Sequence, residues 1–166
     1  MLAEHDLPAE GISWSLRVIQ KEADLLRDYT LMTSVHGIGP VVAATVMGEI
    51  GDLRRFEAHK QLTGYVGLNP ILKESGTSLD LQAQLSKQGN PRVRQVLYLA
   101  ALTACRGNHD LGDTYRRLLA EGKAPMVALG AVMRKLLVIL WAILQSGQPF
   151  DPHHARDSHK TQAPSD

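Results

Sequence analysis

The sequence has little of the residues that mark secreted or metal-binding proteins. Cys105 is the single cysteine, so no internal disulfide can form and a cytoplasmic location is expected. The first residues carry no basic start followed by a long apolar run, which argues against a signal peptide. His36, His59 and His109 stand alone, without cysteine partners at metal-ligand spacing, so we expect no metal site in this chain.

A long apolar run free of charge is also missing. The most apolar stretch, residues 126–144, has Arg134 and Lys135 at its centre. Two such charges cost about 5–7 kcal/mol to insert into a bilayer. The sequence therefore predicts a buried helix here and no contact with a membrane.

Acidic residues are absent from one part of the chain. The formal net charge is only +1, but residues 81–109 contain no Asp or Glu while they contain Lys87, Arg92, Arg94 and Arg106. Such a local excess of positive charge is typical of a face that binds a polyanion. An ordinary solvated helix surface has the same composition, and charge alone leaves both interpretations open.

Helical periodicity dominates what is present. Apolar residues spaced three and four apart predict an all-α, compact multi-helix domain whose central core helix is the last one. We expect six helices, at about 13–32, 41–50, 57–66, 91–104, 111–120 and 123–145. The apolar stripes that we expect to be buried include Leu26 of the first helix, Val41, Ala44 and Met47 of the second, Val93, Val96, Leu97, Ala100, Ala101 and Ala104 of the fourth and Met126 of the last, whereas Asp28 is expected on the outer face of the first. The region of about residues 68–89 lacks this helical period. Within it, apolar and polar residues alternate from Leu79 to Leu85, which favours a short strand. Three parts are expected: an N-terminal helix (1–32), a main domain (33–152) and a disordered tail (153–166).

The stretch SVHGIGPVVAATV, residues 34–46, carries two glycines between apolar helices. A dinucleotide loop needs a preceding strand and a third glycine, but Val42 stands in that place, and no Gly-Lys-Ser/Thr follows. A helix-hairpin-helix fits better, because it binds DNA phosphates through main-chain N–H groups at a helix N-terminus. Gly37, Ile38 and Gly39 are then DNA-binding residues; a purely structural helical hairpin is the alternative.

A second candidate site is the serine-bearing loop KESGTS, residues 73–78, followed by LSKQGNPRVR, residues 85–94. A serine hydroxyl becomes a nucleophile only if its proton is removed and positive charge stabilises the transition state. Lys87, Arg92 and Arg94 are placed to supply that charge. No His-Asp pair accompanies the serines, so protease-like chemistry is not indicated, and an ordinary turn is the alternative.

Three segments occur in an order that resembles a known family. They are GIGPVVAATVMGEIGDLRRFEAHKQLTGYVGLNPILKESG, LSKQGNPRVRQVLYLAALTA and GKAPMVALGAVMRKLLVILWAIL. The chain looks like the C-terminal domain of the Piv-type (DEDD/serine) insertion-sequence transposases and DNA invertases, over roughly residues 33–152. That family pairs a RuvC-like domain, whose carboxylates hold Mg²⁺, with a domain whose serine attacks a DNA phosphate and forms a phosphoserine link.

The resemblance implies roles for particular residues. Ser75 matches the family's nucleophile, with Ser78 as the second candidate, and the hairpin at Gly37–Pro40 matches its helix-hairpin-helix. The basic element of the family is matched by Lys87, Gly89, Asn90 and Arg94, and neighbouring Arg92 is assigned to DNA with them. Ala83-Gln84 departs from the Gly-Arg that family members usually carry before the Ser-Lys step.

The resemblance also implies partners and a division of labour. We expect the chain to be the DNA-binding, serine-bearing part of a DNA transposase or recombinase. It has no room for the RuvC-like domain, so it reads as a fragment or the product of a truncated element, inactive alone. Mg²⁺ then belongs to the missing domain, with no cofactor in this chain, and the expected partners are DNA, a guide RNA as in some family members, and further copies of the chain. The alternatives are a non-catalytic helix-hairpin-helix nucleic-acid-binding module and a protein-interaction domain.

Overall fold

A computed structural model describes residues 9–71, 84–85, 88–107 and 110–151, and in these ranges the protein is all-α, as the periodicity predicts. Two two-residue strands and a 3-10 turn, η1 (Leu53–Arg55), accompany the α-helices. The helices are α1 (Ala9–Thr33), α2 (Pro40–Ile50), α3 (His59–Val66), α4 (Pro91–Ala104), α5 (Asp110–Ala120) and α6 (Pro125–Ser146). α1 begins four residues earlier than predicted; the other predicted helices lie within two residues of the observed bounds.

Helix α6 is the centre of the core, as predicted. It packs against α1, α3, α4 and α5, and its buried side chains include Leu136, Leu137 and Leu140. Met126, which the apolar pattern assigned to the core, is exposed in the first turn instead. α6 is long and apolar enough to cross a membrane, but more than half of its most apolar window is buried inside the domain, as expected for a central core helix.

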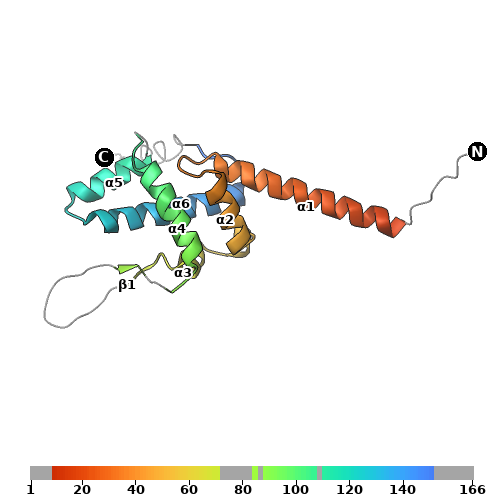
Figure 1. The fold of residues 1–166 in the computed structure, drawn as a ribbon, viewed down its shortest axis with the longest axis horizontal. Coiled ribbons are helices and arrows are strands. Elements are labelled where there is room, and N and C mark those ends of the chain that lie inside the picture. The colour runs from red at the N-terminus through yellow and green to blue at the C-terminus, as the bar shows by residue number, and fades with distance from the viewer. Residues whose placement is uncertain (1–8, 72–83, 86–87, 108–109, 152–166) are drawn as a thin grey trace, which may run out of the picture.

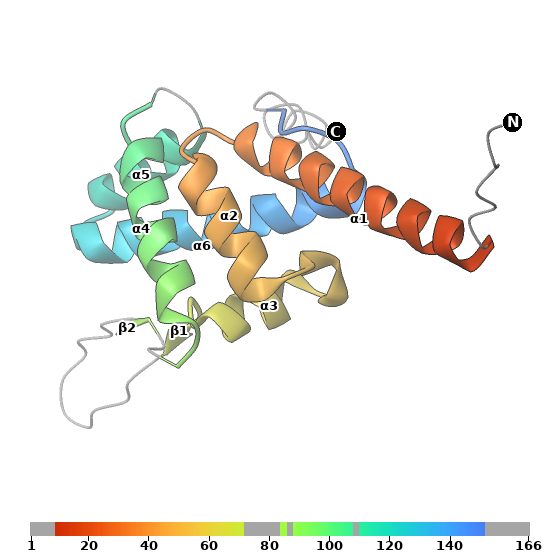
Figure 2. The same ribbon diagram turned by 45° about the vertical axis from the view of Figure 1, so that its right-hand side comes forward.

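Helices α2 and α4 lie side by side across α6 (Figure 2). α4 buries the predicted stripe, except for Val96, which is half-buried. The buried face of α2 differs from the expected one: Ala43, Val46 and Ile50 are inside, whereas Val41 is 71% exposed.

Helix α1 projects away from the other helices and joins them only through its C-terminal end (Figure 1). Leu31 and Met32 are buried there, while Leu26 is 66% exposed. The sequence pattern placed Asp28 on the outer face, but its carboxylate accepts two hydrogen bonds from Arg54, at 2.7 and 2.6 Å. The prediction that the apolar stripe of α1 is buried is therefore wrong for Leu26, because only the C-terminal end of the helix packs against the core.

The predicted strand is present in its last two residues. β1 (Pro70–Ile71) pairs antiparallel with β2 (Gln84–Leu85), with Pro70 opposite Leu85 and Ile71 opposite Gln84. The two ends of the serine-bearing segment are thus held together by backbone pairing. Residues 79–83 of the predicted strand, and the tail beyond residue 151, lie outside the described residues.

Candidate nucleic-acid interface

The hairpin between α1 and α2 is fixed by a glycine and two buried apolar side chains. Gly37 has φ +93°, and a Cβ there would lie 2.7 Å from the carbonyl oxygen of Ala100. Both the left-handed backbone and the close approach to α4 thus require glycine. Val35 and Ile38 are buried, and the Ile38 amide donates to the Val35 carbonyl oxygen at 3.0 Å, so Ile38 supports the hairpin from inside.

The exposed side of the hairpin is the N-terminus of α2. Gly39, the N-cap residue, has open space around it, and Pro40 occupies the first turn. The amides of Val41 and Val42 lie in that first turn and have no partner within the helix. The first turn carries no acidic residue, so the positive end of the helix dipole is not neutralised locally.

An open groove of about 600 Å³ runs beside this helix start. It is lined by the hairpin, by Val42, and by Leu99, Ala100 and Thr103 of α4. Leu99, which lines the groove, is exposed, and so is Val41 in the first turn of α2. No carboxylate is among the described residues that line it. The groove thus has unpartnered amides at one side and apolar side chains at the other. The amides suit the phosphates of a polyanion, and the apolar side chains suit an apolar protein surface.

The second predicted cluster lies at the start of α4. Asn90 is the N-cap residue: its side-chain oxygen accepts from the amides of Arg92, at 3.0 Å, and Val93, at 3.2 Å. Its Nδ2 donates to Glu49 Oε2 at 2.9 Å, and Arg92 Nη1 donates to Glu49 Oε1 at 2.9 Å. These hydrogen bonds, with Asn90 contributing most, lower the pKa of Glu49. Asn90 thus joins α4 to the C-terminal end of α2.

Gly89 and Arg94 join α4 to the end of α3. Gly89 has φ +138°, and a Cβ there would lie 2.5 Å from the carbonyl carbon and oxygen of Val66. Arg94 Nη1 donates to the same Val66 oxygen at 3.0 Å. In the described structure these two residues build a helix junction, a role that the basic pattern of the sequence did not indicate. Arg92, in contrast, keeps 78% of its side chain exposed.

The two predicted DNA-binding clusters lie at opposite ends of α4. Gly37 packs against Ala100 and Ala104 near its C-terminal end, whereas Asn90 caps its N-terminus. Ten residues of helix separate Asn90 from Ala100, which corresponds to about 15 Å. The structure therefore does not gather them into one pocket, and a ligand that contacts both has to run along α4.

The catalytic candidates Ser75 and Ser78, and the basic residue Lys87, lie outside the described residues. The segment that contains the two serines is bounded by β1 and β2. Three residues separate the end of α3 from β1, and three separate β2 from Gly89. The segment therefore leaves and re-enters the fold at the junction of α3 with α4. Arg92 and Arg94 begin the helix at that junction.

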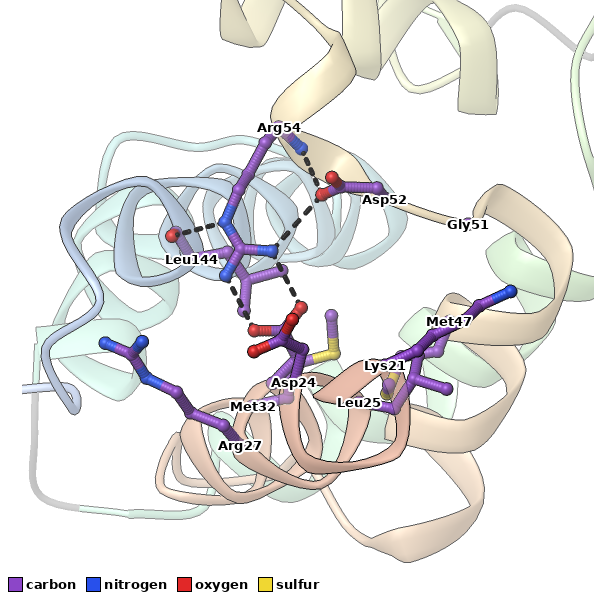
Figure 3. A pocket seen from close by; sticks show the side chains of 11 residues that line it. Lys21, Asp24, Leu25, Arg27, Met32, Met47, Gly51, Asp52, Arg54 and Leu144 are labelled. Carbon is purple, nitrogen blue, oxygen red and sulfur yellow. Dashed lines mark hydrogen bonds and ion pairs between the residues drawn. The ribbon is translucent and has the colours of Figure 1, made fainter. Parts of the chain in front are cut away.

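A cavity of about 400 Å³ between α1, the α2–η1 loop and the end of α6 was not anticipated (Figure 3). Arg54 crosses it: the guanidinium binds Asp28 and Asp52, and its Nε donates to the Leu144 carbonyl oxygen at 2.9 Å. The carboxylate of Asp28 raises the pKa of Arg54, so its charge is permanent. The acids here balance an arginine, and no group of three or more His, Cys, Asp or Glu suited to a metal occurs among the described residues.

The known proteins similar to this chain include a gene-inverting protein, an insertion-element protein and a putative transposase. The pilin gene-inverting protein of Moraxella bovis is 30% identical over 123 residues, covering 74% of this chain and 38% of the relative. An insertion element IS110 protein of Streptomyces coelicolor is 30% identical over 121 residues (73% and 30%), and a putative transposase of Sinorhizobium fredii is 30% identical over 174 residues (86% and 44%). The chain thus spans less than half the length of each of these relatives.

Residues 29–116, more than half of the chain, match the sequence profile described as "Transposase IS116/IS110/IS902 family". The matched range begins in the last turn of α1 and ends within α5, so it includes the hairpin, the α3–α4 junction and the segment with Ser75. This profile places the chain among the transposases. The chain is a member of the IS116/IS110/IS902 transposase family, and the resemblance to the Piv-type enzymes is confirmed.

Proposed function

We propose that this chain is the DNA-binding, serine-bearing part of a transposase or site-specific recombinase. The observation that carries the proposal is the family match over residues 29–116, which spans both candidate sites in one continuous stretch. The protein acts in the cytoplasm on chromosomal DNA. A guide RNA and further copies of the chain are additional proposed partners, because strand exchange needs several active sites.

DNA is bound through its phosphates, along the path between the two ends of α4. At one end, the hairpin is a helix-hairpin-helix whose first-turn amides at Val41 and Val42 point at a phosphate. At the other end, Arg92 supplies an exposed guanidinium. Ile38, Gly37, Gly89, Asn90 and Arg94 support this surface by packing and hydrogen bonds. None of these contacts distinguishes one base from another, so sequence specificity comes from elsewhere.

The chemistry is assigned to Ser75, with Ser78 as the second candidate. The hydroxyl oxygen bonds to phosphorus, the bond from phosphorus to one strand oxygen breaks, and the serine proton goes to that leaving oxygen. A DNA hydroxyl later attacks the phosphoserine and returns a proton to the serine. Mg²⁺, held by the carboxylates of a RuvC-like domain outside this chain, supplies charge stabilisation. Lys87, Arg92 and Arg94 are the residues of this chain proposed to stabilise the phosphate charge.

The decisive experiment traps the covalent step. The chain is incubated with duplex DNA, Mg²⁺ and a RuvC-like domain supplied as a separate polypeptide, and adducts are resolved on a denaturing gel. Wild type and Ser78→Ala are expected to form a protein–DNA adduct, and Ser75→Ala none. An adduct of unchanged yield in Ser75→Ala would overturn the assignment of the nucleophile.

A non-catalytic nucleic-acid-binding module is the second candidate function. It is favoured by the structural use of Gly89, Asn90 and Arg94, which occupies much of the basic element in contacts within the chain. This candidate predicts DNA binding with no adduct under any condition. A third, a protein-interaction domain, is favoured by the exposed Val41 and Leu99 and predicts no dependence of binding on salt.

A further inference from the structure

Three side chains around η1 and α3 form a surface cluster that none of the contacts above uses. The guanidinium carbon of Arg55 lies 4.8 Å from the ring centroid of Phe56 and 5.2 Å from that of Tyr65. The two rings are 5.5 Å apart and tilted by 56°. We call Arg55, Phe56 and Tyr65 the stacking platform.

The platform is exposed at its top and anchored at its base. Tyr65 is 44% exposed and Arg55 is exposed, whereas Phe56 packs partly into the core. The carbonyl oxygen of Phe56 accepts a hydrogen bond of 3.1 Å from Trp141 Nε1 of α6. The backbone under the rings is thus tied to the central helix, and the platform is preorganised.

Two adjacent arginines are used in different ways. Arg54 is neutralised by Asp28 and Asp52, as described above. Arg55 forms no ion pair with any residue in the described ranges, and its positive charge lies on aromatic rings instead. An exposed cation–π contact contributes only about 0.5–1 kcal/mol, so stability alone is a weak reason for an uncompensated guanidinium on two rings.

A planar guanidinium held on aromatic rings has the chemistry that nucleic-acid-binding proteins use for unpaired bases. The Arg55 guanidinium lies close to both rings and is exposed, so a further planar group can stack on this surface, and its N–H groups can donate to a phosphate. Bases stack on both aromatic and guanidinium planes. A base inside a duplex has both faces covered by its neighbours, so only an unpaired base can bind in this way.

The position of the platform favours the same ligand. Tyr65 immediately precedes Val66, whose carbonyl oxygen Arg94 binds and against which Gly89 packs. β1 begins four residues after Val66 and leads to the segment that holds Ser75. Through Tyr65 the platform therefore adjoins the α3–α4 junction, at which the segment that holds Ser75 leaves the described fold.

We propose that the stacking platform binds an unpaired base of a nucleic-acid strand, by stacking on Arg55 and Tyr65. The proposal rests on the proposed function, because it names a further ligand group at the same surface. The base belongs either to DNA opened at the site of strand exchange or to an RNA, and these two sources present the same planar group.

The test measures the affinity of the whole chain by fluorescence anisotropy for three probes: a single-stranded DNA, an RNA of the same sequence, and a blunt duplex of that DNA. Tyr65→Leu and Arg55→Ala remove the stacking surfaces. Tyr65→Phe keeps the ring, and Arg55→Lys keeps the charge without the plane. Arg117→Ala, on α5, is the control for loss of an exposed arginine. Thermal unfolding of each variant checks that the fold is retained.

We expect Tyr65→Leu, Arg55→Ala and Arg55→Lys to weaken single-strand binding at least about fivefold. Tyr65→Phe and Arg117→Ala should stay near wild type, and duplex binding should change little in every variant. The probe that shows the larger loss, RNA or DNA, identifies the source of the base.

Two results would overturn the inference while the proposed function stands. In one, Arg55→Lys binds single strands as wild type does, which means that charge alone matters. In the other, the variants weaken duplex and single strands equally, which means a backbone contact. If wild type binds none of the three probes, the proposed function itself fails.

Discussion

At the scale of single residues, the glycines of the hairpin have separate tasks. Gly37 has a left-handed backbone and touches α4, whereas Gly39 has φ −88° and open space. We expect Gly37→Ala to lower the free energy of unfolding by about 1–3 kcal/mol, since it adds backbone strain and a clash with the Ala100 carbonyl. Gly39→Ala should cost less than about 1 kcal/mol as an N-cap change. Urea unfolding measures both, and equal midpoints for the two variants would contradict this division.

The carboxylate of Glu49 gives the α2–α4 junction a dependence on pH. Its pKa is lowered in the folded protein by hydrogen bonds from Asn90 and Arg92. A depressed folded pKa contributes stability above the usual pKa of glutamate, about 4.3, and that stability is lost as the pH falls through the folded pKa. Wild type should therefore lose more stability on acidification from about pH 6 to about pH 3 than Glu49→Gln does. Chemical unfolding at both pH values tests this, with Glu57→Gln as the exposed control; parallel losses in the three proteins would refute it.

The residue scale is where the sequence was least informative. The Gly89-Asn90 step and Arg94 look like a basic phosphate-binding element, because glycine, asparagine and arginine are common in such sites. In the described structure they connect helices instead: Gly89 has a positive φ, Asn90 caps α4, and Arg94 binds the Val66 carbonyl oxygen. Local composition cannot separate these roles, since the partners Val66 and Glu49 are 28 and 41 positions away from Arg94 and Asn90.

At the scale of elements, Arg54 determines how α1 leaves the domain. It connects Asp28 of α1 to the last turn of α6 through the Leu144 carbonyl. Arg54→Ala leaves Asp28, 15% exposed, without this partner, and should weaken the docking of α1 by about 1–3 kcal/mol. Arg54→Lys should rescue little, because an ammonium cannot make the bidentate contact.

Amide hydrogen exchange is the measurement for this prediction. Exchange at the C-terminal end of α1 should accelerate in Arg54→Ala while the centre of α6 stays protected. Glu22→Gln, an exposed charge change on the same helix, serves as the control. Equal protection of α1 in wild type and Arg54→Ala would show that Leu31 and Met32 alone hold the helix.

Periodicity predicted where the helices lie, but it predicted the face that each helix buries only for some of them. α4 and α6 contact several neighbours, so their apolar stripes coincide with the core. α2 and α1 each have one face open, and there the pattern misplaced Val41 and Asp28. Asp28 was assigned outward because it is charged, and its partner Arg54 lies in a turn that shows no helical period. A charged residue is predictable as buried only when its partner is known.

At the scale of the whole molecule, the proposed DNA path along α4 can be described by its length and by the charged groups at its ends. Its ends are about 15 Å apart along α4, a distance of roughly four to five base pairs. At one end Arg92 carries an exposed positive charge, whereas at the other the hairpin itself offers amides and Arg106 is exposed just past the end of α4. Nucleic-acid affinity should therefore fall with salt, and part of that fall should depend on Arg92.

Arg92→Ala tests this arrangement. If the guanidinium neutralises one phosphate, its loss should reduce the slope of log affinity against log salt for duplex DNA by about 0.9. The variant also frees Glu49 from its ion pair, so affinity at low salt should drop further through repulsion. Arg92→Ala combined with Glu49→Gln removes that repulsion and should recover affinity while keeping the reduced slope. Arg117→Ala on α5 should leave the slope unchanged, because its charge lies off the path. An unaltered slope in Arg92→Ala would place the DNA elsewhere on the domain.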